Sequence, residues 1–539
     1  MARLANTLIA IVILLTTVMV SCAPAAPVAE VYKDPIKTNA GLISGDTRGA
    51  NDDIHVYKGV PFAAPPVGDL RWKSPQPVTP WEGVKECTEF GAAPNCWAAL
   101  GKPPKVSEDC LYLNVWTPAT KVGEKLPVVV WFYGGGFRFG YATTPLYDGT
   151  RLAGKGVVVV TFNYRTGVFG FLAHPLLSKE SEHGVSGNYG ILDQIAALQW
   201  VKNNIAAFGG DPYNVTVFGQ SAGSISIVTL MASPLAKGLF QKAISHSYAD
   251  LDFYMDLKTA KYGNGSAEAQ GEQLAKDLGC DTAADPLACL RAKPADEIMT
   301  KATPPGDYWS PGYKYGPVVD GWLLTDHPFN LFLAGKQMNI PLVIGTTTDE
   351  YSLFQISIIP EVSTYQAFMK SLFGDKAAQI LTAYPAADDN AAKTAQKNVM
   401  TLYSFYCPAK EIANSMSLIK SPVYLFEFTR VPPGAKRWGA YHALDIGYVF
   451  GNLVPILPTP EPSLYFDDAD NALSETMMGY WTSFAAKGNP NHQGATEWPA
   501  YTAQTSQYLT LGNTLEVRTC LDNDVTSLMF QTAKDKRSK

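Results

Sequence analysis

The sequence lacks the features that would point to several large classes of protein. It has no long run of basic residues and a formal net charge of −6, so nucleic acid is not an expected partner. No C-x-x-C pair or cluster of cysteines and histidines has the spacing of metal ligands, so we expect neither a metal site nor a cofactor. Internal repeats and low-complexity tracts are also missing. The remaining balance, 46% hydrophobic and 17% charged residues, indicates a globular chain.

The apolar run at the N-terminus is too short to cross a bilayer comfortably. It covers 13 residues from Leu8 to Val20, which is typical of a signal-peptide core. The run ends at Ser21-Cys22, before a Pro/Ala-rich stretch, and this pattern resembles a bacterial lipoprotein processing site; simple cleavage near the alanines is the alternative. We therefore predict a signal peptide over 1–21 and a tether over 22–34. The expected location is the periplasm or the outer membrane, with a lipid on Cys22 as the anchor, or alternatively the medium after secretion.

The other cysteines fit an exported protein. Beyond Cys22 they are Cys87, Cys96, Cys110, Cys280, Cys289, Cys407 and Cys520. The close spacings of Cys96 with Cys110 and of Cys280 with Cys289 predict two small disulfide loops. Cys407 and Cys520 are candidates for a third pair, which leaves Cys87 as a buried free thiol.

Strand and helix patterns alternate along the chain. Apolar runs predict strands at 111–116, 126–132, 156–162, 341–345 and 423–428, and apolar residues at helical spacing predict a helix over 190–208. Residues 250–315 and 360–415 are richer in charge and in helix formers, which indicates helical insertions. The fold class is therefore α/β, with a large, mostly parallel sheet flanked by helices. The length suggests several domains, but large α/β folds often exceed that prior, and we predict one domain over 35–535.

The most informative motif is Gly219-Gln220-Ser221-Ala222-Gly223. It follows the apolar run 215–218 and precedes the apolar segment 224–231, so a strand, a sharp turn and a helix are expected. In the α/β-hydrolase fold such a turn exposes a nucleophilic serine above the sheet. The alternative is an ordinary strand-to-helix turn that contains glycine. Acyl-transfer chemistry requires three further parts, namely an oxyanion hole, an acid and a histidine.

Three consecutive glycines, Gly134 to Gly136, follow the predicted buried strand after Tyr133. Such a run costs backbone entropy, so it is expected to bring a structural benefit. Backbone N–H groups can stabilise an oxyanion only where the chain approaches it closely, and glycine permits this approach. We predict an oxyanion hole made by Gly135, Gly136 and Ala222, the residue after the candidate nucleophile. A flexible loop at the strand end is the alternative.

Several segments resemble type B carboxylesterases, the family that includes cholinesterases and bacterial para-nitrobenzyl esterases. The resemblance covers nearly the whole mature chain and is carried by Lys58–Gly68, Glu108–Trp116, Asn163–Arg165, Gly187–Gln194 and Trp481–Asn491. It implies an α/β-hydrolase fold and serine-dependent hydrolysis of carboxylic esters through an acyl-enzyme. It also implies the disulfides Cys96–Cys110 and Cys280–Cys289.

The acid and the histidine of the triad should follow Ser221 in that order. Asp349 and Glu350 follow the apolar run 341–344 after a four-residue stretch, 345–348, and the residues alone do not choose between them. The resemblance selects Glu350. It also selects His442, within a segment that matches the family's catalytic histidine, whereas His327 precedes the acid and is in the wrong order.

The substrate pocket is expected to be apolar and aromatic, with Phe137, Gln220, Tyr313, Tyr315 and Phe354 as candidate lining residues. Each aromatic side chain taken alone is more often part of a core. Many members of the family have glutamate before the serine, so Gln220 removes a negative charge near the histidine and predicts a weaker preference for cationic substrates.

The expected substrates are small to medium aryl and alkyl esters. The 13 residues between Cys96 and Cys110 form a shorter segment than the lid of cholinesterases, which suggests an open entrance. Two alternatives remain at this point. One is an amidase or carbamate hydrolase with the same triad, and the other is a non-catalytic binding protein related to cholinesterases.

Overall fold

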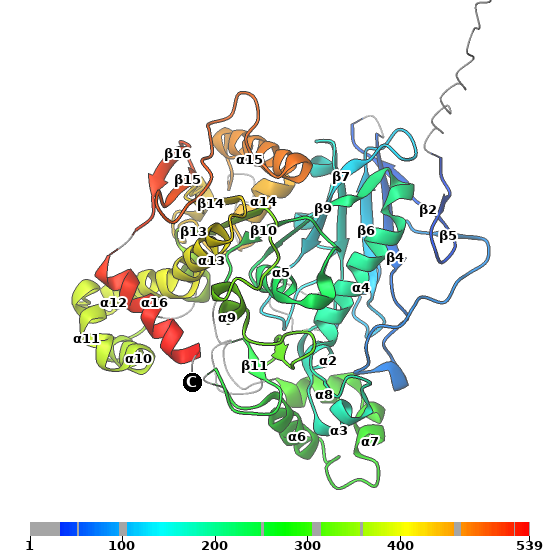
Figure 1. Ribbon diagram of the computed structural model, residues 1–539, viewed down its shortest axis with the longest axis horizontal. Coiled ribbons are helices and arrows are strands. Elements are labelled where there is room, and N and C mark those ends of the chain that lie inside the picture. The colour runs from blue at the N-terminus through cyan, green and yellow to red at the C-terminus, as the bar shows by residue number, and fades with distance from the viewer. Residues whose placement is uncertain are drawn as a thin grey trace, which may run out of the picture.

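The computed structural model describes residues 33–50, 53–95, 105–249, 253–262, 264–303, 314–355, 359–457, 465–521 and 523–537. The predicted signal peptide, Cys22, Cys96 and Tyr313 lie outside these ranges. Within them, an 11-stranded sheet in the order β16-β15-β14-β13-β10-β9-β7-β8-β6-β4-β3 runs through the centre of the protein (Figure 1). Two small sheets, β1-β2-β5 and β11-β12, lie outside it.

The middle of the large sheet is parallel and its edges are antiparallel. The parallel strands are β8 (Val158–Phe162), β7 (Leu126–Phe132), β9 (Gly210–Gln220), β10 (Lys242–His246), β13 (Leu342–Thr347), β14 (Val423–Phe428) and β15 (Gln507–Leu511). The antiparallel strands are β6 (Tyr112–Thr117), β4 (Ile54–Pro61) and β3 (Asp46–Arg48) at one edge and β16 (Glu516–Thr519) at the other. All five predicted strands are confirmed, and so is the α/β class with a mostly parallel sheet. Their apolar runs are continuous because the sheet is covered on both faces.

The small sheets consist of β1 (Ile36–Lys37), β2 (Leu42–Ser44), β5 (Val84–Glu86), β11 (Met255–Asp256) and β12 (Val318–Val319). Helices flank the large sheet. They are α1 (Thr150–Ala153), α2 (Gly167–Phe171), α3 (Pro175–Glu180), α4 (Tyr189–Asn204), α5 (Ala222–Ala232), α9 (Pro328–Leu333), α14 (Asp445–Phe450), α15 (Asp468–Lys487) and α16 (Asp524–Arg537). The predicted helix over 190–208 is confirmed as α4, which continues into a short 3₁₀ turn, η3 (Ile205–Phe208). Every residue of α5 is buried, and its polar side chains Ser224, Ser226 and Thr229 are hydrogen-bonded inside the protein.

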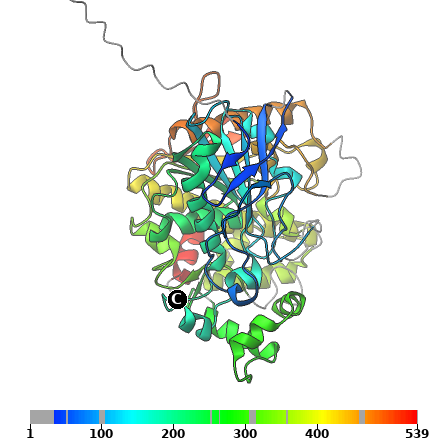
Figure 2. The same ribbon diagram turned by 90° about the vertical axis from the view of Figure 1, so that its right-hand side faces the viewer.

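Both predicted helical insertions are confirmed. The first contains α6 (Ala267–Asp277), α7 (Pro286–Ala292) and α8 (Ala295–Ala302), which appear as green helices at the lower end of the molecule (Figure 2). The second contains α10 (Val362–Phe373), α11 (Ala377–Ala383), α12 (Asp389–Thr401), the π-helical turn η7 (Leu402–Tyr406) and α13 (Cys407–Leu418). Helices α10, α11, α12 and α16 lie together at one side of the protein (Figure 1). They share a hydrophobic cluster that includes Tyr365, Met369, Val399 and Met529 and is separate from the main core.

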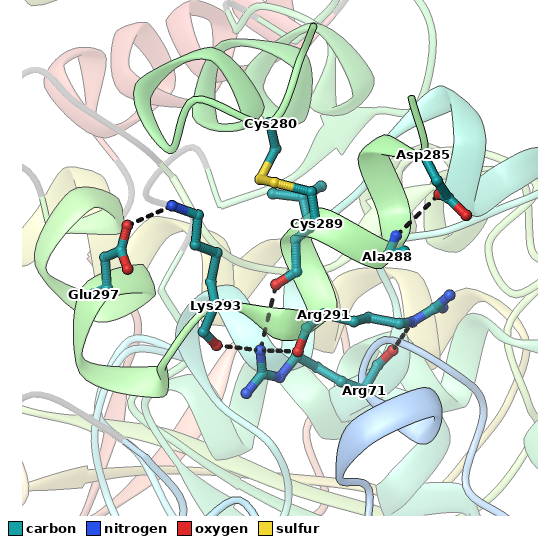
Figure 3. The surroundings of a disulfide bond; sticks show 9 residues. Arg71, Cys280, Asp285, Ala288, Cys289, Arg291, Lys293 and Glu297 are labelled. Carbon is teal, nitrogen blue, oxygen red and sulfur yellow. Dashed lines mark hydrogen bonds and ion pairs between the residues drawn. A yellow bond between two sulfur atoms is a disulfide. The ribbon is translucent and has the colours of Figure 1, made fainter. Parts of the chain in front are cut away.

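One disulfide bond, Cys280–Cys289, ties the end of α6 to α7. Figure 3 shows the neighbouring guanidinium of Arg71, which donates to the carbonyl oxygens of Arg291 and Lys293 at 3.0 and 2.8 Å. The same guanidinium forms an ion pair with Glu108 at 2.5 Å. The N-terminal part of the chain therefore holds the C-terminal end of α7, and the predicted small loop at this place is confirmed.

The other cysteine predictions have different outcomes. Cys110 is buried and forms no disulfide bond within the described ranges, whereas Cys96 lies outside them, so the Cys96–Cys110 pairing stays a prediction. Burial raises the pKa of Cys110 well above its ordinary value. Cys407 and Cys520 are both buried, and no disulfide bond joins them; Cys407 packs in the cluster of the second insertion and Cys520 packs in the main core. Cys87 is buried and free, as predicted.

A membrane-spanning helix would have to be both long and apolar, and none of the helices in the described ranges meets both conditions.

Candidate active site

Ser221 lies at the point where β9 ends and α5 begins. Its backbone has φ 58° and ψ −122°, a conformation that costs a non-glycine residue about 1–3 kcal/mol. The Ser221 N–H donates to the carbonyl oxygen of His246 on the neighbouring strand β10 at 3.0 Å. This bond holds the strained residue at the C-terminal ends of these two central strands.

The two glycines of the motif allow α5 to begin very close to β7. A Cβ atom added at Gly223 would lie 1.9 Å from the carbonyl oxygen of Phe132, and one added at Gly219 would lie 2.8 Å from the same atom. Side chains at these positions would therefore push the helix away from the strand. This steric limit explains the spacing of the motif, in which Ser221 lies between the two glycines that approach Phe132.

The glycine loop 134–136 lies directly beside the serine. A Cβ atom at Gly134 would lie 2.9 Å from the Cβ of Ser221. Gly135 and Gly136 have φ 113° and 58°, a region that favours glycine. The N–H groups of Gly135, Gly136 and Ala222 donate no hydrogen bond to another residue in the described ranges. Because Ala222 opens α5, its N–H is also one of the unsatisfied donors at a helix N-terminus.

Two tyrosines, Tyr133 and Tyr164, fix the chain where the glycine loop begins. The rings of Tyr133 and Tyr164 stack with their centroids 4.4 Å apart. The hydroxyl of each donates to the carbonyl oxygen of the other at 3.0 Å. Burial raises the pKa of Tyr164, so its hydroxyl stays protonated as a donor. The loop is further fixed where the N–H of Gly167 donates to the carbonyl oxygen of Phe137 at 2.5 Å.

The two neighbouring carboxylates after β13 point in different directions. Glu350 begins the 3₁₀ turn η5 (Glu350–Gln355), is fully buried, and accepts from the N–H of Thr347 at 2.8 Å through Oε1. Its Oε2 lies 2.5 Å from Nδ1 of His442. Asp349 instead forms an ion pair with Lys397 at 2.5 Å and accepts from the N–H of Ala440 at 3.1 Å. Of the two carboxylates, Glu350 is therefore the one that contacts His442.

The imidazole of His442 is held at both nitrogens. Nδ1 contacts Glu350, and Nε2 lies 2.9 Å from the amide nitrogen of Gln220. Since an amide nitrogen only donates, His442 Nε2 accepts and Nδ1 carries the proton that faces Glu350. This is the tautomer that a general base needs. In the described ranges no hydrogen bond joins the Ser221 side chain to His442, although Ser221 directly follows Gln220.

Two aromatic rings flank the imidazole. The ring centroids of Phe354 and Phe405 each lie 5.2 Å from that of His442. Phe354 was predicted as a pocket residue, whereas Phe405 was missed because it belongs to the π-helical turn η7 in the second insertion. A π turn often occurs at a functional site, but the sequence around Phe405 carries no local signal for it.

The other predicted pocket residues are in different surroundings. Gln220 contacts His442, as described above. Phe137 is fully buried and packs edge-on against Phe171 and Phe253, with centroids 5.1 and 5.8 Å apart. Tyr315 is also buried, at 2% exposure, and both side chains belong to the main core. Tyr313 lies outside the described residues.

A second buried histidine, His246, lies in the strand next to the nucleophile motif and was not predicted to have a role. Its Nδ1 lies 2.6 Å from a carboxylate oxygen of Asp445, and its Nε2 accepts from the indole N–H of Trp481 at 3.0 Å. Asp445 begins α14, three residues after His442. His246 therefore contacts the serine turn through its backbone and the helix that follows His442 through its side chain.

Residues able to hold a metal are not gathered anywhere in the described ranges, where no group of three or more His, Cys, Asp or Glu side chains has a suitable arrangement. The site consists of a strained serine, free N–H donors and a histidine–carboxylate pair. These are the parts required for acyl transfer.

Comparison with known proteins gives consistent matches over nearly the whole chain. The profile of the carboxylesterase family matches residues 33–528. The chain is 38% identical over 499 residues to the fumonisin B1 esterase of Sphingopyxis macrogoltabida, covering 91% of this chain and 89% of that protein. It is 36% identical over 513 residues to the para-nitrobenzyl esterase of Bacillus subtilis (strain 168), covering 92% of this chain and 98% of that protein.

Proposed function

The chain belongs to the carboxylesterase family and is a carboxylic ester hydrolase, and from this premise we propose that it acts through a triad of Ser221, Glu350 and His442. The observation that carries the proposal is the position of His442. Its Nδ1 lies 2.5 Å from Glu350, and its Nε2 contacts the residue directly before Ser221. The strained backbone of Ser221 adds support, because such strain is typical of an exposed nucleophile.

In the proposed acylation step, the Ser221 oxygen attacks the ester carbonyl carbon while His442 Nε2 takes the hydroxyl proton. The carbonyl oxygen becomes an oxyanion, which accepts hydrogen bonds from the N–H groups of Gly135, Gly136 and Ala222. His442 then gives its proton to the leaving alcohol as the carbon–oxygen bond breaks. Water attacks the acyl-enzyme in the same way, with His442 again as the base, and releases the acid and free Ser221. Glu350 stabilises the imidazolium formed in each half-reaction.

The substrates that we propose are small to medium aryl and alkyl esters. Phe354 and Phe405 place apolar surface beside His442, which favours an apolar group near the scissile bond. Gln220 adds no negative charge next to the imidazole, so cationic esters gain no attraction there. The names of the two relatives describe one enzyme for an aryl-methyl ester and one for esters of fumonisin B1.

A panel of para-nitrophenyl esters of increasing acyl length, with matching anilides, tests the proposal. We expect turnover of the short and medium esters. Ser221→Ala should lower kcat/KM by roughly 10⁴-fold or more, because the nucleophile is lost. Ser371→Ala, at an exposed serine on α10, is the matched control and should retain wild-type activity. Full activity in Ser221→Ala would refute the serine mechanism, and faster turnover of anilides than of esters would refute the ester preference.

We further propose that the protein is exported and anchored by a lipid on Cys22. The support is the apolar run from Leu8 to Val20, which Ser21 alone separates from this cysteine. Mass spectrometry of the mature N-terminus tests the proposal. A diacylglyceryl-modified Cys22 is expected, and an unmodified N-terminus beyond Cys22 would contradict it.

A further inference from the structure

The side-chain amide of Gln220 is hydrogen-bonded to Nε2 of His442, the nitrogen that takes the serine proton in the proposed reaction. Gln220 is 5% exposed at the end of β9, and its Nε2 lies 2.9 Å from His442 Nε2. On its other side the amide meets the glycine loop, because a Cβ atom at Gly134 would lie 2.8 Å from the Gln220 Oε1. The amide is therefore confined between the loop and the imidazole.

This contact depends on the protonation state of the imidazole. The N–H of Gln220 donates to the lone pair of Nε2, so the bond exists only while Nε2 is unprotonated. In an imidazolium, Nε2 of His442 would also carry an N–H, which would face the N–H of Gln220. These two donors would repel each other unless the amide turned over. The contact therefore stabilises neutral His442 with its proton on Nδ1.

The arrangement of charges near His442 leaves Gln220 as the neighbour that favours the neutral imidazole. Glu350 on η5 contacts Nδ1 and favours the charged form of the ring. The next carboxylate on the same turn, Asp349, is paired with Lys397 of α12. Asp445 of α14 is paired with His246 of β10. Phe354 and Phe405, whose rings flank the imidazole, carry no charge, so among these neighbours Gln220 is the polar side chain that opposes the effect of Glu350.

We propose that Gln220 is a positioning residue that keeps His442 neutral in the free enzyme and yields Nε2 to the Ser221 hydroxyl when an ester binds. This inference rests on the proposed triad. The exchange replaces one donor by another on the same lone pair, so no proton is gained or lost before the serine attacks. Because Gln220 favours the neutral imidazole, the enzyme should remain active at lower pH than a variant with an acidic residue at position 220.

The pH dependence of kcat/KM for an uncharged ester, para-nitrophenyl acetate, tests the proposal in the wild type, Gln220→Met and Gln220→Glu. Methionine has a similar length but no N–H, so the acid limb should move up by about half to one pH unit. Glutamate adds a charge next to the ring, so its limb should move further, by about one to three pH units. Below the wild-type limb, Gln220→Glu should thus keep about a tenth of the wild-type activity or less, while its activity at high pH stays within about tenfold.

Gln199→Glu, which adds the same charge at an exposed position on α4, is the control and should leave the profile unchanged. Acid limbs that coincide in the wild type and Gln220→Glu would overturn the proposal. A Gln220→Met limb at or below the wild-type pH would also overturn it, and this arm remains informative if the buried carboxylate prevents folding. An inactive Ser221→Ala together with coincident limbs would refute the role of Gln220 alone, whereas an active Ser221→Ala would refute the triad itself.

Discussion

Asp349 connects three parts of the site, and its removal should damage both stability and catalysis. One carboxylate oxygen pairs with Lys397 on α12, and the other accepts from the N–H of Ala440, two residues before His442. The backbone N–H of Asp349 donates in return to the carbonyl oxygen of Ala440 at 3.0 Å. The turn that carries Glu350, the segment that leads to His442 and helix α12 of the second insertion thus meet at the side chain of Asp349.

The magnitude follows from these contacts. The side chains of Lys397 and Asp349 are 26% and 21% exposed, so their ion pair contributes about 1 kcal/mol. Ala440 is fully buried, and its orphaned N–H would cost about 1–3 kcal/mol. We therefore expect Asp349→Ala to lower the free energy of unfolding by about 2–4 kcal/mol. Asp349→Asn keeps an acceptor for Ala440, so its cost should be about 1 kcal/mol.

Urea denaturation and steady-state kinetics measure the two effects. In Asp349→Ala, kcat should fall about tenfold or more, because a displaced imidazole loses its alignment with the serine. A double-mutant cycle with Lys397→Met should give a coupling of about 1 kcal/mol to Asp349. Equal losses in Asp349→Ala and Asp349→Asn would refute the role assigned to the Ala440 bond. Unchanged kcat in Asp349→Ala would refute the link between this side chain and His442.

Two further predictions concern steric limits and thiol reactivity. Gly223→Ala places a Cβ atom 1.9 Å from the carbonyl oxygen of Phe132, so we expect a loss of several kcal/mol in urea denaturation or no soluble protein; wild-type stability would contradict the packing argument. Burial raises the pKa of Cys87 to about 11, so at pH 8 this thiol is protonated and should react with iodoacetamide only after unfolding. Peptide mapping of the native and urea-unfolded protein checks this, and rapid labelling of native Cys87 would contradict it.

The local structure around Ser221 was predictable from sequence because its constraints are local. A strand, a turn and a helix within a dozen residues require glycine at Gly219 and Gly223, and this requirement is visible as a motif. The choice between Asp349 and Glu350 was different. Both carboxylates belong to one short turn, and only the position of His442, 92 residues away, distinguishes them. The residues alone therefore left the choice open, and the family resemblance selected Glu350.

The support provided by the second insertion could not be predicted for the same reason. Lys397 and Phe405 contact the acid turn and the imidazole, but their sequence neighbourhood is that of ordinary helices. The close spacing of Cys280 and Cys289 predicted their disulfide bond, whereas Cys407 and Cys520, far apart in sequence, were paired without such a signal and are not bonded. Cys280 and Cys289 flank one helical corner, whereas Cys407 and Cys520 are assigned to separate hydrophobic clusters that only the folded chain reveals.

The separate hydrophobic cluster of α10, α11, α12 and α16 has a consequence for how the enzyme loses activity. This cluster does not share the main core, yet α12 supplies both Lys397 and the Thr401 hydroxyl that accepts from the N–H of Tyr351 at 3.2 Å. A helical layer of this kind can open without unfolding the sheet. Mild warming would then abolish the activity while the strands stay intact. The half-life of the activity would therefore report the stability of the insertion and not the barrier to global unfolding.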